Sequence, residues 1–506
     1  MLRIVLALLG AVMALAAWLT SSPHGSSPDD GFHLSNIWCA RGFVEGRCQF
    51  VGDGLETGEV FVPAPIARIS CYAQDRGQDA SCSDDIFSEA LDELRQAPGS
   101  GNLSGERPGI YYRAMHPLVG DDAFASVWRI RIANALLAIV VSALVLRLTR
   151  PSVRQALIGS WLVTSVPLGL FLITSVNSGA WGLIGLTNLW AAALTALEPG
   201  PRSTRIQAGL LTIVTAVMAI GSRLEALPYA ALSLVAVAVV AWRGDLRRLV
   251  VEHRRGTAIG AATTALGVAL LTTWRGFDYL RATGEALSTG LTTWTERGVG
   301  NALFYNLMEF PTLVAGAFGW RWGLGWLDTE LPGLVAFPAM AAFVALAFTG
   351  LGRSDRRKVV VVPAFVVAIV VYPMLVHAIR GLLIYEEYQP RQFIALLYLL
   401  CAFALLVPRG RPLVVLRRSQ RIAISTSIIV ANGIALHVNT RRYVSGLSRE
   451  WLFDLNENVR WWWVGLPAPM TMWIVGTIGV GILVVLGIGA FRPVHEHDEL
   501  GATPPA

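Results

Sequence analysis

The amino-acid sequence predicts an all-α polytopic membrane protein with about 12 transmembrane helices and a structured first extracytoplasmic loop. Three observations support this fold class. The 506 residues are 54% hydrophobic and only 15% charged, whereas soluble chains carry about 25% charged residues. Apolar runs long enough to cross a bilayer recur along most of the chain. Basic residues gather in the short connections between these runs, as they do in membrane proteins.

The first expected helix covers residues 4–20 within segment 1–20, and it could instead be a cleaved signal peptide. Residues 21–126 then form the long extracytoplasmic loop. Residues 127–273 hold helices 2–7, residues 274–331 form a second extracytoplasmic loop, residues 332–490 hold helices 8–12, and residues 491–506 form a cytoplasmic tail. The expected helices after the first are 127–148, 156–174, 179–197, 206–221, 227–242, 257–273, 332–350, 359–377, 393–407, 422–438 and 470–490.

Charge is unevenly distributed along the chain. Residues 21–126 contain 16 acidic residues and 7 arginines, a net charge of −9, so the rest of this +6 chain carries +15. With alternating crossings, the basic clusters fall on one face, which the positive-inside rule makes cytoplasmic. That rule explains them better than nucleic-acid binding. We therefore expect a multi-pass cell-membrane protein with both termini cytoplasmic. The clusters are Arg147, Arg150 and Arg154; Arg202 and Arg205; Arg243, Arg247, Arg248, Arg254 and Arg255; Arg353, Arg356, Arg357 and Lys358; and Arg409, Arg411, Arg417, Arg418 and Arg421.

Four of the five cysteines lie in the acidic segment, and Cys401 lies in an apolar run. Four cysteines in one extracytoplasmic segment fit two disulfides in an oxidising compartment. Three pairings are possible, and we expect the local pairs Cys39–Cys48 and Cys71–Cys82. Zinc is the less favoured alternative because the spacing lacks a Cys-x2-Cys pair.

The long loops are expected to contain structure of their own. Residues 84–97 predict a short helix, because Ser83 can cap it and apolar residues, Leu94 among them, recur along one stripe. Residues 301–322 are apolar and aromatic but contain Pro311 and several glycines. They are interpreted as a re-entrant or interfacial helix pair and not as a span.

The segment 28–33, Pro-Asp-Asp-Gly-Phe-His, lies a few residues beyond the first helix. Two carboxylates are costly there, because a charge at bilayer depth costs roughly 3 kcal/mol. Asp29 and Asp30 point in different directions, so one could accept a proton from a hydroxyl while the other orients a group or holds a divalent cation. The alternative is a solvated turn with Asp30 as the N-cap of a helix. On that helix His33 would share a face with Asp30.

Three further extracytoplasmic segments combine polar residues near helix ends. Residues 111–117 hold two tyrosines and His116, and the tyrosines alone would suit a membrane-interface belt. Asn177 lies in a short turn, and turns favour small polar residues whether or not they bind a ligand. Arg223 could meet a phosphate, or it could pair with Glu225 and do nothing further.

Two late segments favour carbohydrate and phosphate chemistry. Trp326 and Asp328 place an aromatic face beside an acid, which suits a sugar ring, although belt tryptophans are common. Gln389 and Arg391 lead into a span from outside, where arginine opposes the positive-inside trend. A lipid phosphate bound through fork-like hydrogen bonds would explain Arg391. Pairing with Glu386 or Glu387 is the alternative.

Other motifs add little. The His-Glu-His run at 495–497 is a weak metal pattern in a tail. No nucleotide-binding loop, dinucleotide fingerprint, metalloprotease motif or hydrolase elbow occurs in the sequence, which argues against a pump with its own nucleotide site.

The ordered set of motifs resembles the bacterial predicted-membrane-protein family called domain of unknown function 2142. Segment 28–33 resembles its Pro-Asp-Glu-x-x-His start, and 115–117 resembles its proline- and tyrosine-rich element. Segments 175–179, 326–332 and 388–393 resemble its Ser-Val-Asn-Pro-[Ser/Asp]-Gly, Trp-Leu-Asp-Thr-x-Leu-Pro and Gln-Gly-Arg-Tyr elements. Asp30 replaces the usual Glu, Ser178 replaces Pro, and Pro390 replaces Gly. Because the family is similar to GT-C glycosyltransferases, the resemblance implies a GT-C-like fold.

The resemblance also implies a function and roles for the site residues. The function is an inverting transfer of a sugar from a polyprenyl-phosphate donor to an extracytoplasmic glycan or lipid acceptor, beside membrane lipid. Asp30, with Asp29 second, would be catalytic, and Arg391 and Arg223 would bind the donor phosphate. A divalent cation is compatible with this chemistry but not required. The implied cavity lining is His33, His116, Asn177, Trp326, Asp328 and Gln389.

Two other classes of function fit the sequence. A transporter or flippase of lipid-linked glycans suits twelve spans, but it predicts functional charges at the middle of the membrane. A non-catalytic envelope-assembly protein would use the acidic loop to bind a partner. It predicts that Asp30→Asn leaves activity intact.

Overall fold

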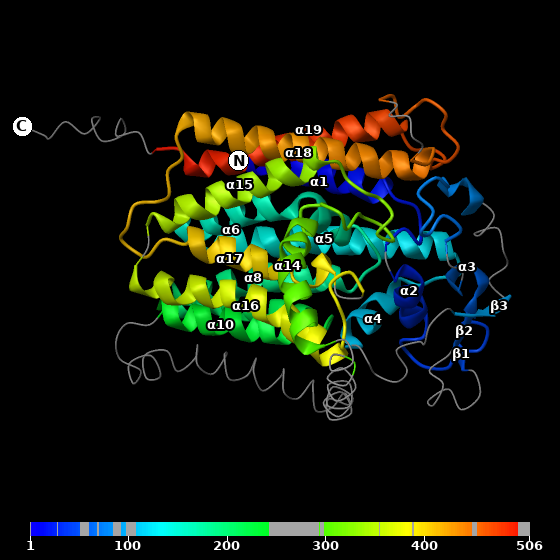
Figure 1. The fold of residues 1–506 in the computed structure, drawn as a ribbon, viewed down its shortest axis with the longest axis horizontal. Coiled ribbons are helices and arrows are strands. Elements are labelled where there is room, and N and C mark those ends of the chain that lie inside the picture. The colour runs from blue at the N-terminus through cyan, green and yellow to red at the C-terminus, as the bar shows by residue number, and fades with distance from the viewer. Residues whose placement is uncertain are drawn as a thin grey trace, which may run out of the picture.

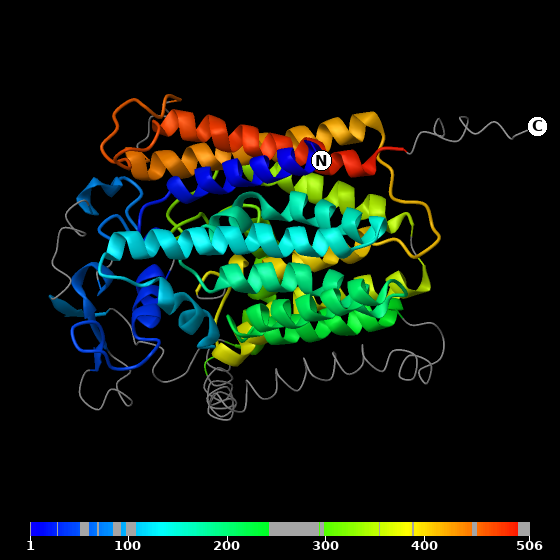
Figure 2. The same cartoon turned by 180° about the vertical axis from the view of Figure 1, so that it is seen from behind.

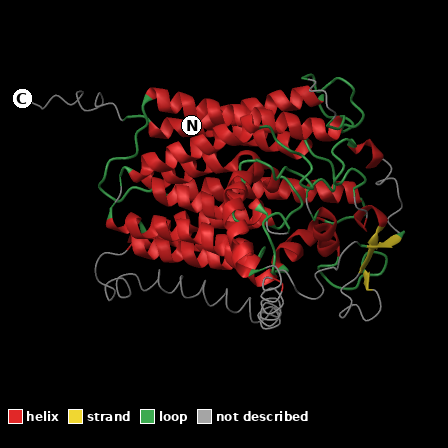
Figure 3. Ribbon diagram, in the orientation of Figure 1, coloured by secondary structure: helices red, strands yellow, loops and turns green. Residues whose placement is uncertain are grey.

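Long apolar helices lie side by side and form most of the structure, and short helices with three strands lie at one end of them (Figures 1 and 3). We call this the strand-bearing end and the opposite one the far end. The computed structural model describes residues 2–27, 29–50, 60–67, 70–83, 93–97, 108–241, 293, 298–353, 355–386, 389–447 and 453–493.

Within the described residues, nine helical segments are long and apolar enough to cross a membrane. With two shorter apolar helices, they match every expected span except 257–273, which lies outside the described residues. The nine are α1 (Leu2–Thr20), α5 (Ala123–Leu148), the continuous segment of α6 (Pro151–Thr164), η4 (Ser165–Gly169) and α7 (Leu170–Ile173), α8 (Gly179–Leu197), α9 (Arg202–Ile220), α15 (Gly333–Leu351), α16 (Arg356–Arg380), α18 (Arg418–Val444) and α19 (Pro469–Ile488). The shorter two are α10 (Ala226–Ala241) and α17 (Ile394–Leu405).

The core of the bundle is built on small residues that let helices approach closely. A Cβ on Gly185 of α8 would lie 2.6 Å from the Thr215 carbonyl oxygen of α9. A Cβ on Gly479 of α19 would lie 2.7 Å from the Ala14 nitrogen of α1, and Figure 2 shows α1 in blue beside α19. Close backbone contact at small residues is typical of helices that pack inside a bilayer.

Large apolar side chains cover the outward faces of the helices. Leu136, Leu210, Phe348 and Val367 are exposed, on α5, α9, α15 and α16 respectively. Soluble proteins rarely leave so much contiguous apolar surface uncovered. These faces suit contact with lipid.

The strand-bearing end combines short helices with a three-stranded antiparallel sheet of order β1-β2-β3. The prediction of a helix over 84–97 is wrong at its C-terminal part, where Leu94 pairs with Pro63 in the sheet. Cross-strand pairing there replaces the helical stripe that the sequence suggested, and residues 84–92 lie outside the described part. The elements are α2 (Asp30–Trp38), β1 (Gln49–Phe50), β2 (Val60–Pro63), α3 (Ala64–Ala67), β3 (Leu94–Gln96), α4 (Ile110–Met115) and η3 (His116–Leu118).

The segment expected to be a re-entrant or interfacial helix pair contains one helix, α14 (Val299–Gly316), followed by turns up to the start of α15. Figure 1 shows α14 running across the direction of the spanning helices. Its exposed side chains include Leu303, Phe304 and Met308. An apolar face on a crosswise helix fits a position at the membrane interface.

Candidate functional site

Helix α2 begins directly after Asp29, and this start separates the two carboxylates. Asp29 occupies the N-cap position with a left-handed φ of 64°, and its side chain makes no capping hydrogen bond. Asp30 is the first helical residue. The interpretation of Asp30 as the N-cap is therefore wrong by one residue. The left-handed turn directs the neighbouring carboxylates to different partners.

The Asp30 carboxyl group is buried and incompletely satisfied. Asp30 is 3% exposed. Its Oδ2 accepts a hydrogen bond from the backbone N–H of Ser27 at 3.4 Å. Oδ1 has no hydrogen-bond partner among the described residues. Burial raises the pKa of Asp30 to about 7, although the positive charge of Arg131 and the Ser27 hydrogen bonds act in the opposite direction. A carboxyl group with this pKa can exchange a proton near neutral pH.

Arg131, whose charge acts on Asp30, holds three chain segments together. From α5 its guanidinium donates to the carbonyls of Leu19 at 2.7 Å, Ser22 at 2.9 Å and Thr174 at 2.8 Å. The side chain is buried. The sequence reasoning did not single it out, although an arginine nine residues inside α5 was a usable signal, because charges within spans are rare and functional.

His33 of α2 and Tyr112 of α4 form a buried pair. The His33 Nδ1 and the Tyr112 hydroxyl oxygen lie 3.0 Å apart, and the two rings stack. Tyr111 and Tyr112 are 0% and 2% exposed. The belt interpretation of these tyrosines is therefore wrong, because belt residues face the membrane interface.

His116 contacts the opposite end of α2 from Asp30. Its Nδ1 lies 2.8 Å from the carbonyl oxygen of Ile37. Ile37 is seven residues beyond Asp30, which is about 10 Å along a helix. His116 therefore fixes the C-terminal end of α2, and it does not contact the carboxylates.

Arg391 reaches the site from a distant part of the sequence. It lies in η5 (Pro390–Gln392), and its guanidinium pairs with Asp29 Oδ2 at 3.0 Å. The Arg391 side chain is 10% exposed and that of Asp29 35%. Asp29 is a partner of Arg391 that the sequence did not suggest, and Glu387 lies outside the described residues. The pair joins the first extracytoplasmic motif to the last one.

Gln389 and Arg391 line a small pocket with Phe171, Trp322 and Leu327. The backbone N–H of Gln389 donates to the Gln392 side chain at 2.9 Å, and Gln389 Oε1 has no hydrogen-bond partner among the described residues. The pocket has a volume of ≈ 20 Å³, a little more than the roughly 10–15 Å³ that one water molecule needs. A sugar would enter only if the surrounding loops moved.

Asn177 and Arg223 contact each other across two turns. Asn177 Oδ1 accepts hydrogen bonds from the Gly179 backbone at 2.8 Å and from Arg223 at 2.9 Å. Arg223 Nε is buried and has no partner in the described part of the chain. A Cβ on Gly179 would lie 3.2 Å from that Nε. Glycine therefore leaves the space that the guanidinium needs.

Trp326 and Asp328 fasten the second long loop to the first. The Trp326 indole donates to the Gly25 carbonyl at 2.8 Å. Asp328 pairs with Arg442 at 2.8 Å, and these side chains are 6% and 0% exposed. Both residues thus have structural contacts, and the Asp328 carboxylate is already paired.

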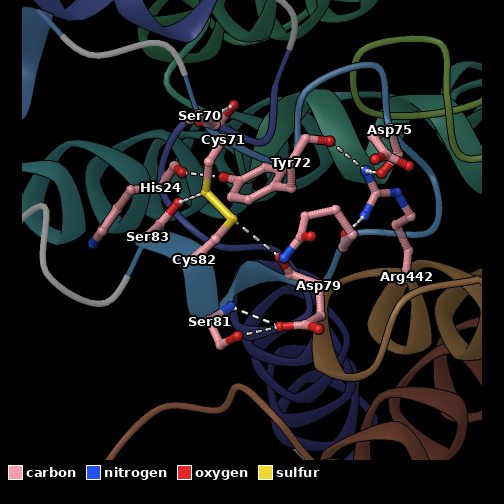
Figure 4. Close-up of a disulfide and its surroundings, with 12 residues drawn as sticks. His24, Ser70, Cys71, Tyr72, Asp75, Asp79, Ser81, Cys82, Ser83 and Arg442 are labelled. Carbon is pink, nitrogen blue, oxygen red and sulfur yellow. Dashed lines mark hydrogen bonds between the residues drawn. A yellow bond between two sulfur atoms is a disulfide. The ribbon is translucent and has the colours of Figure 1, made fainter.

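The two disulfides have the local pairing expected from the sequence, Cys39–Cys48 and Cys71–Cys82. Figure 4 shows the second one beside Tyr72, whose hydroxyl donates to the His24 carbonyl. Burial raises the pKa of Tyr72 well above its usual value, so the donor stays protonated. Arg442 donates to the Tyr72 carbonyl at 2.7 Å. These contacts fix the loop that precedes Asp29.

No group of three or more metal-ligating side chains occurs among the described residues. Asp29 faces Arg391, and Asp30 is buried against the Ser27 backbone. A divalent cation takes several oxygen ligands in one cluster. These two carboxylates therefore do not form a cation site by themselves, and residues 495–497 lie outside the described part.

The structure brings together Asp29, Asp30 and Arg391, with Trp326 on the adjoining loop. His33, His116, Asn177 and Arg223 make the separate contacts described above. The sequence profile of a family described as Predicted membrane protein (DUF2142) matches residues 12–400. No curated protein and no solved structure matches the chain.

Proposed function

We propose that this chain, which belongs to the DUF2142 family of predicted membrane proteins, is a membrane glycosyltransferase. It would move a sugar from a polyprenyl-phosphate donor to an extracytoplasmic glycan or lipid acceptor. One observation carries the proposal: a buried carboxyl group, Asp30, with one oxygen that no described residue contacts, lies next to Asp29, which pairs with the largely covered Arg391. Asp30 would supply the base, and Arg391 would supply the anion site beside it.

Asp30 is suited to act as the general base. Its pKa of about 7 places the proton-accepting form within reach at neutral pH, where a base of matched pKa is most effective. Oδ1 has a lone pair that no described residue occupies. An acceptor hydroxyl could donate its hydrogen bond to this oxygen.

Arg391 is suited to bind the donor phosphate. Arg391 forms an ion pair with Asp29, a carboxylate that a phosphate with more charge and more oxygens can replace. Arginine binds phosphate through two parallel hydrogen bonds. Displacement of Asp29 would also move a negative charge away from the bound phosphate. Arg223, with its buried Nε, offers a second donor.

The reaction is a single displacement at the anomeric carbon. The acceptor oxygen forms the new bond as Asp30 removes its proton, and the bond from the anomeric carbon to the phosphate oxygen breaks. The electron pair leaves with polyprenyl phosphate, whose charge Arg391 neutralises. Attack opposite the leaving group inverts the anomeric configuration.

The strand-bearing end is proposed to be extracytoplasmic. Both disulfides lie there, and disulfides persist in oxidising compartments. Arg150, Arg357 and Arg409 lie near helix ends on the far side, as cytoplasmic residues would under the positive-inside rule. A GT-C-like arrangement of helices is part of the same proposal.

The transporter alternative gains no support from the position of the charges. Arg131 donates to carbonyls at the ends of α1 and α7, near the strand-bearing end. Lys358 donates to Gly350 and Ala404 at the ends of α15 and α17. Transporters place their coupling charges near the bilayer midplane, whereas these two described residues contact helix ends.

A transfer assay tests the proposal. Radiolabelled polyprenyl-phosphate sugars are supplied to membranes that contain the wild type, Asp30→Asn or no chain. We expect label to move to an extracytoplasmic acceptor with the wild type only, since Asn cannot take up the proton. Undiminished transfer by Asp30→Asn would refute the catalytic role. An envelope-assembly protein would show no transfer with any variant.

A further inference from the structure

The far end of the bundle contains a cavity of ≈ 280 Å³ that the proposed chemistry does not use. Its walls come from the ends of five helices, α6, α8, α10, α16 and α17. Figure 1 shows that the connections after α15 and α17 lie at this end, opposite the strands. We call it the far-end pocket. Its charged lining residues are Arg150, Glu198, Asp355, Arg357, Lys358 and Arg409.

The far-end pocket carries a surplus of positive charge. Four basic residues face two acidic ones in its lining, a net charge of +2. Glu198 is already shared by two guanidiniums, with Arg150 at 2.9 Å and Arg409 at 3.4 Å. Asp355 accepts the Lys358 backbone N–H at 3.0 Å as a helix cap. The carboxylates are therefore occupied, and the surplus is left for an anion.

Hydrogen-bond donors also remain in the pocket. Among the described residues Arg357 makes one hydrogen bond, from Nη1 to the Val240 carbonyl at 2.8 Å, although a guanidinium has five N–H donors. Lys358 uses two of its three donors, on the carbonyls of Gly350 at 3.0 Å and Ala404 at 2.7 Å. The helix N-termini of α6 and α16 start at the pocket, at Arg150 and Asp355. Both termini add positive potential.

We propose that the far-end pocket binds an anionic phosphate ester, one whose negative charge no ammonium group of its own balances. Guanidinium groups match the geometry of phosphate oxygens, and a basic pocket between helix ends is a recognised site for anionic lipid head groups. Val361 and Phe403 supply an apolar wall next to the cations, which suits a head group joined to a lipid. The volume is at the lower limit for a ligand pocket, so the ligand is small. A free phosphate has the same chemistry, and the experiment separates the two sources.

Two pairs of neighbouring arginines provide matched variants. Arg357 lines the pocket, and the adjacent Arg356 is exposed and does not line it. Arg409 lines the pocket, and Arg411 in the same connection is exposed and does not. Arg357→Gln and Arg409→Gln are the test variants. Arg356→Gln and Arg411→Gln remove the same charge from the same segments.

The experiment measures lipid binding to the purified full chain in neutral detergent by native mass spectrometry. The probes are phosphatidylglycerol, phosphatidylcholine and inorganic phosphate. We expect phosphatidylglycerol to bind the wild type, and each test variant to lose about tenfold in affinity, which corresponds to about 1.4 kcal/mol. The controls should stay within about twofold. Thermal unfolding of each variant shows that it is folded.

The results separate a lipid head group from a free phosphate as the ligand, and two of them would overturn the proposal. If inorganic phosphate displaces phosphatidylglycerol and binds as tightly, the ligand is a free phosphate. If inorganic phosphate does not compete, the ligand is a lipid head group. Equal losses in test and control variants would show only general surface charge and would overturn the proposal. Equal binding of phosphatidylcholine would do the same. This inference does not depend on glycosyl transfer.

Discussion

Replacing Asp30 by asparagine should stabilise the protein at neutral and alkaline pH. Burial raises the pKa of Asp30 from 3.8 to about 7, so the folded state favours the protonated carboxyl more than the unfolded state does. The stability that this preference supplies is present at low pH and is lost as pH rises through the folded pKa. Asparagine keeps the shape and carries no charge, so it avoids this loss.

The magnitude follows from the size of the pKa shift. Each pKa unit corresponds to about 1.36 kcal/mol, so a shift of about three units makes the ionised Asp30 unfavourable by about 4 kcal/mol above pH 7. Between pH 5 and pH 7 alone, the wild type should lose about 2–3 kcal/mol from this residue. Asp30→Asn should show no such loss.

Thermal unfolding of the purified protein between pH 5 and pH 9 measures this effect. The Tm of the wild type should fall across this range more than the Tm of Asp30→Asn, and the two curves should separate with rising pH. Asp29→Asn is the matched control, because the Asp29 side chain is 35% exposed and forms an ion pair of a kind worth about 0–1 kcal/mol. Parallel curves for the wild type and Asp30→Asn would refute the reasoning.

Three further predictions concern contacts around the site. Arg391→Lys should raise the KM for a polyprenyl-phosphate donor about tenfold, because lysine cannot form the paired hydrogen bonds of a guanidinium; initial-rate kinetics measure it, and an unchanged KM would contradict it. Asp328→Asn should destabilise the protein by about 3–5 kcal/mol by leaving the buried Arg442 without its counter-ion; a Tm equal to that of the wild type would disprove this. Serine at Cys71 and Cys82 should cost about 2–3 kcal/mol by releasing a short loop, and protease digestion should then cut near Tyr72 sooner than in the wild type.

The spans could be predicted from the sequence because their signal is local. The expected helix over 179–197 has the bounds of α8, since its apolar run ends at turn residues on both sides. The disulfides Cys39–Cys48 and Cys71–Cys82 were also predictable, because close spacing in one segment favours local pairing. The error at Leu94 arose because a strand partner can override a helical pattern.

The contacts of the site could not be predicted, since they join residues far apart in the sequence. Asp29 and Arg391 are separated by 362 residues, so the sequence suggested only a lipid phosphate or the neighbouring glutamates as partners of Arg391. The same limit applies to Asp328 and Arg442, 114 residues apart. The burial of Tyr111 and Tyr112 depends on how α4 packs, which the local sequence does not specify. The role of Arg131 was accessible from its place within an apolar run.

The dependence of sugar transfer on pH tests the central claim, that Asp30 is the base, most directly. With donor well below its KM, the wild-type rate should rise with pH, reach half its maximum near pH 7 and level off about one pH unit higher, since the active form is the ionised carboxyl with a pKa of about 7. Asp30→Asn should lose this rise together with the activity. A wild-type rate that does not change between pH 5 and pH 9, or a variant that keeps the same rise, would contradict the account.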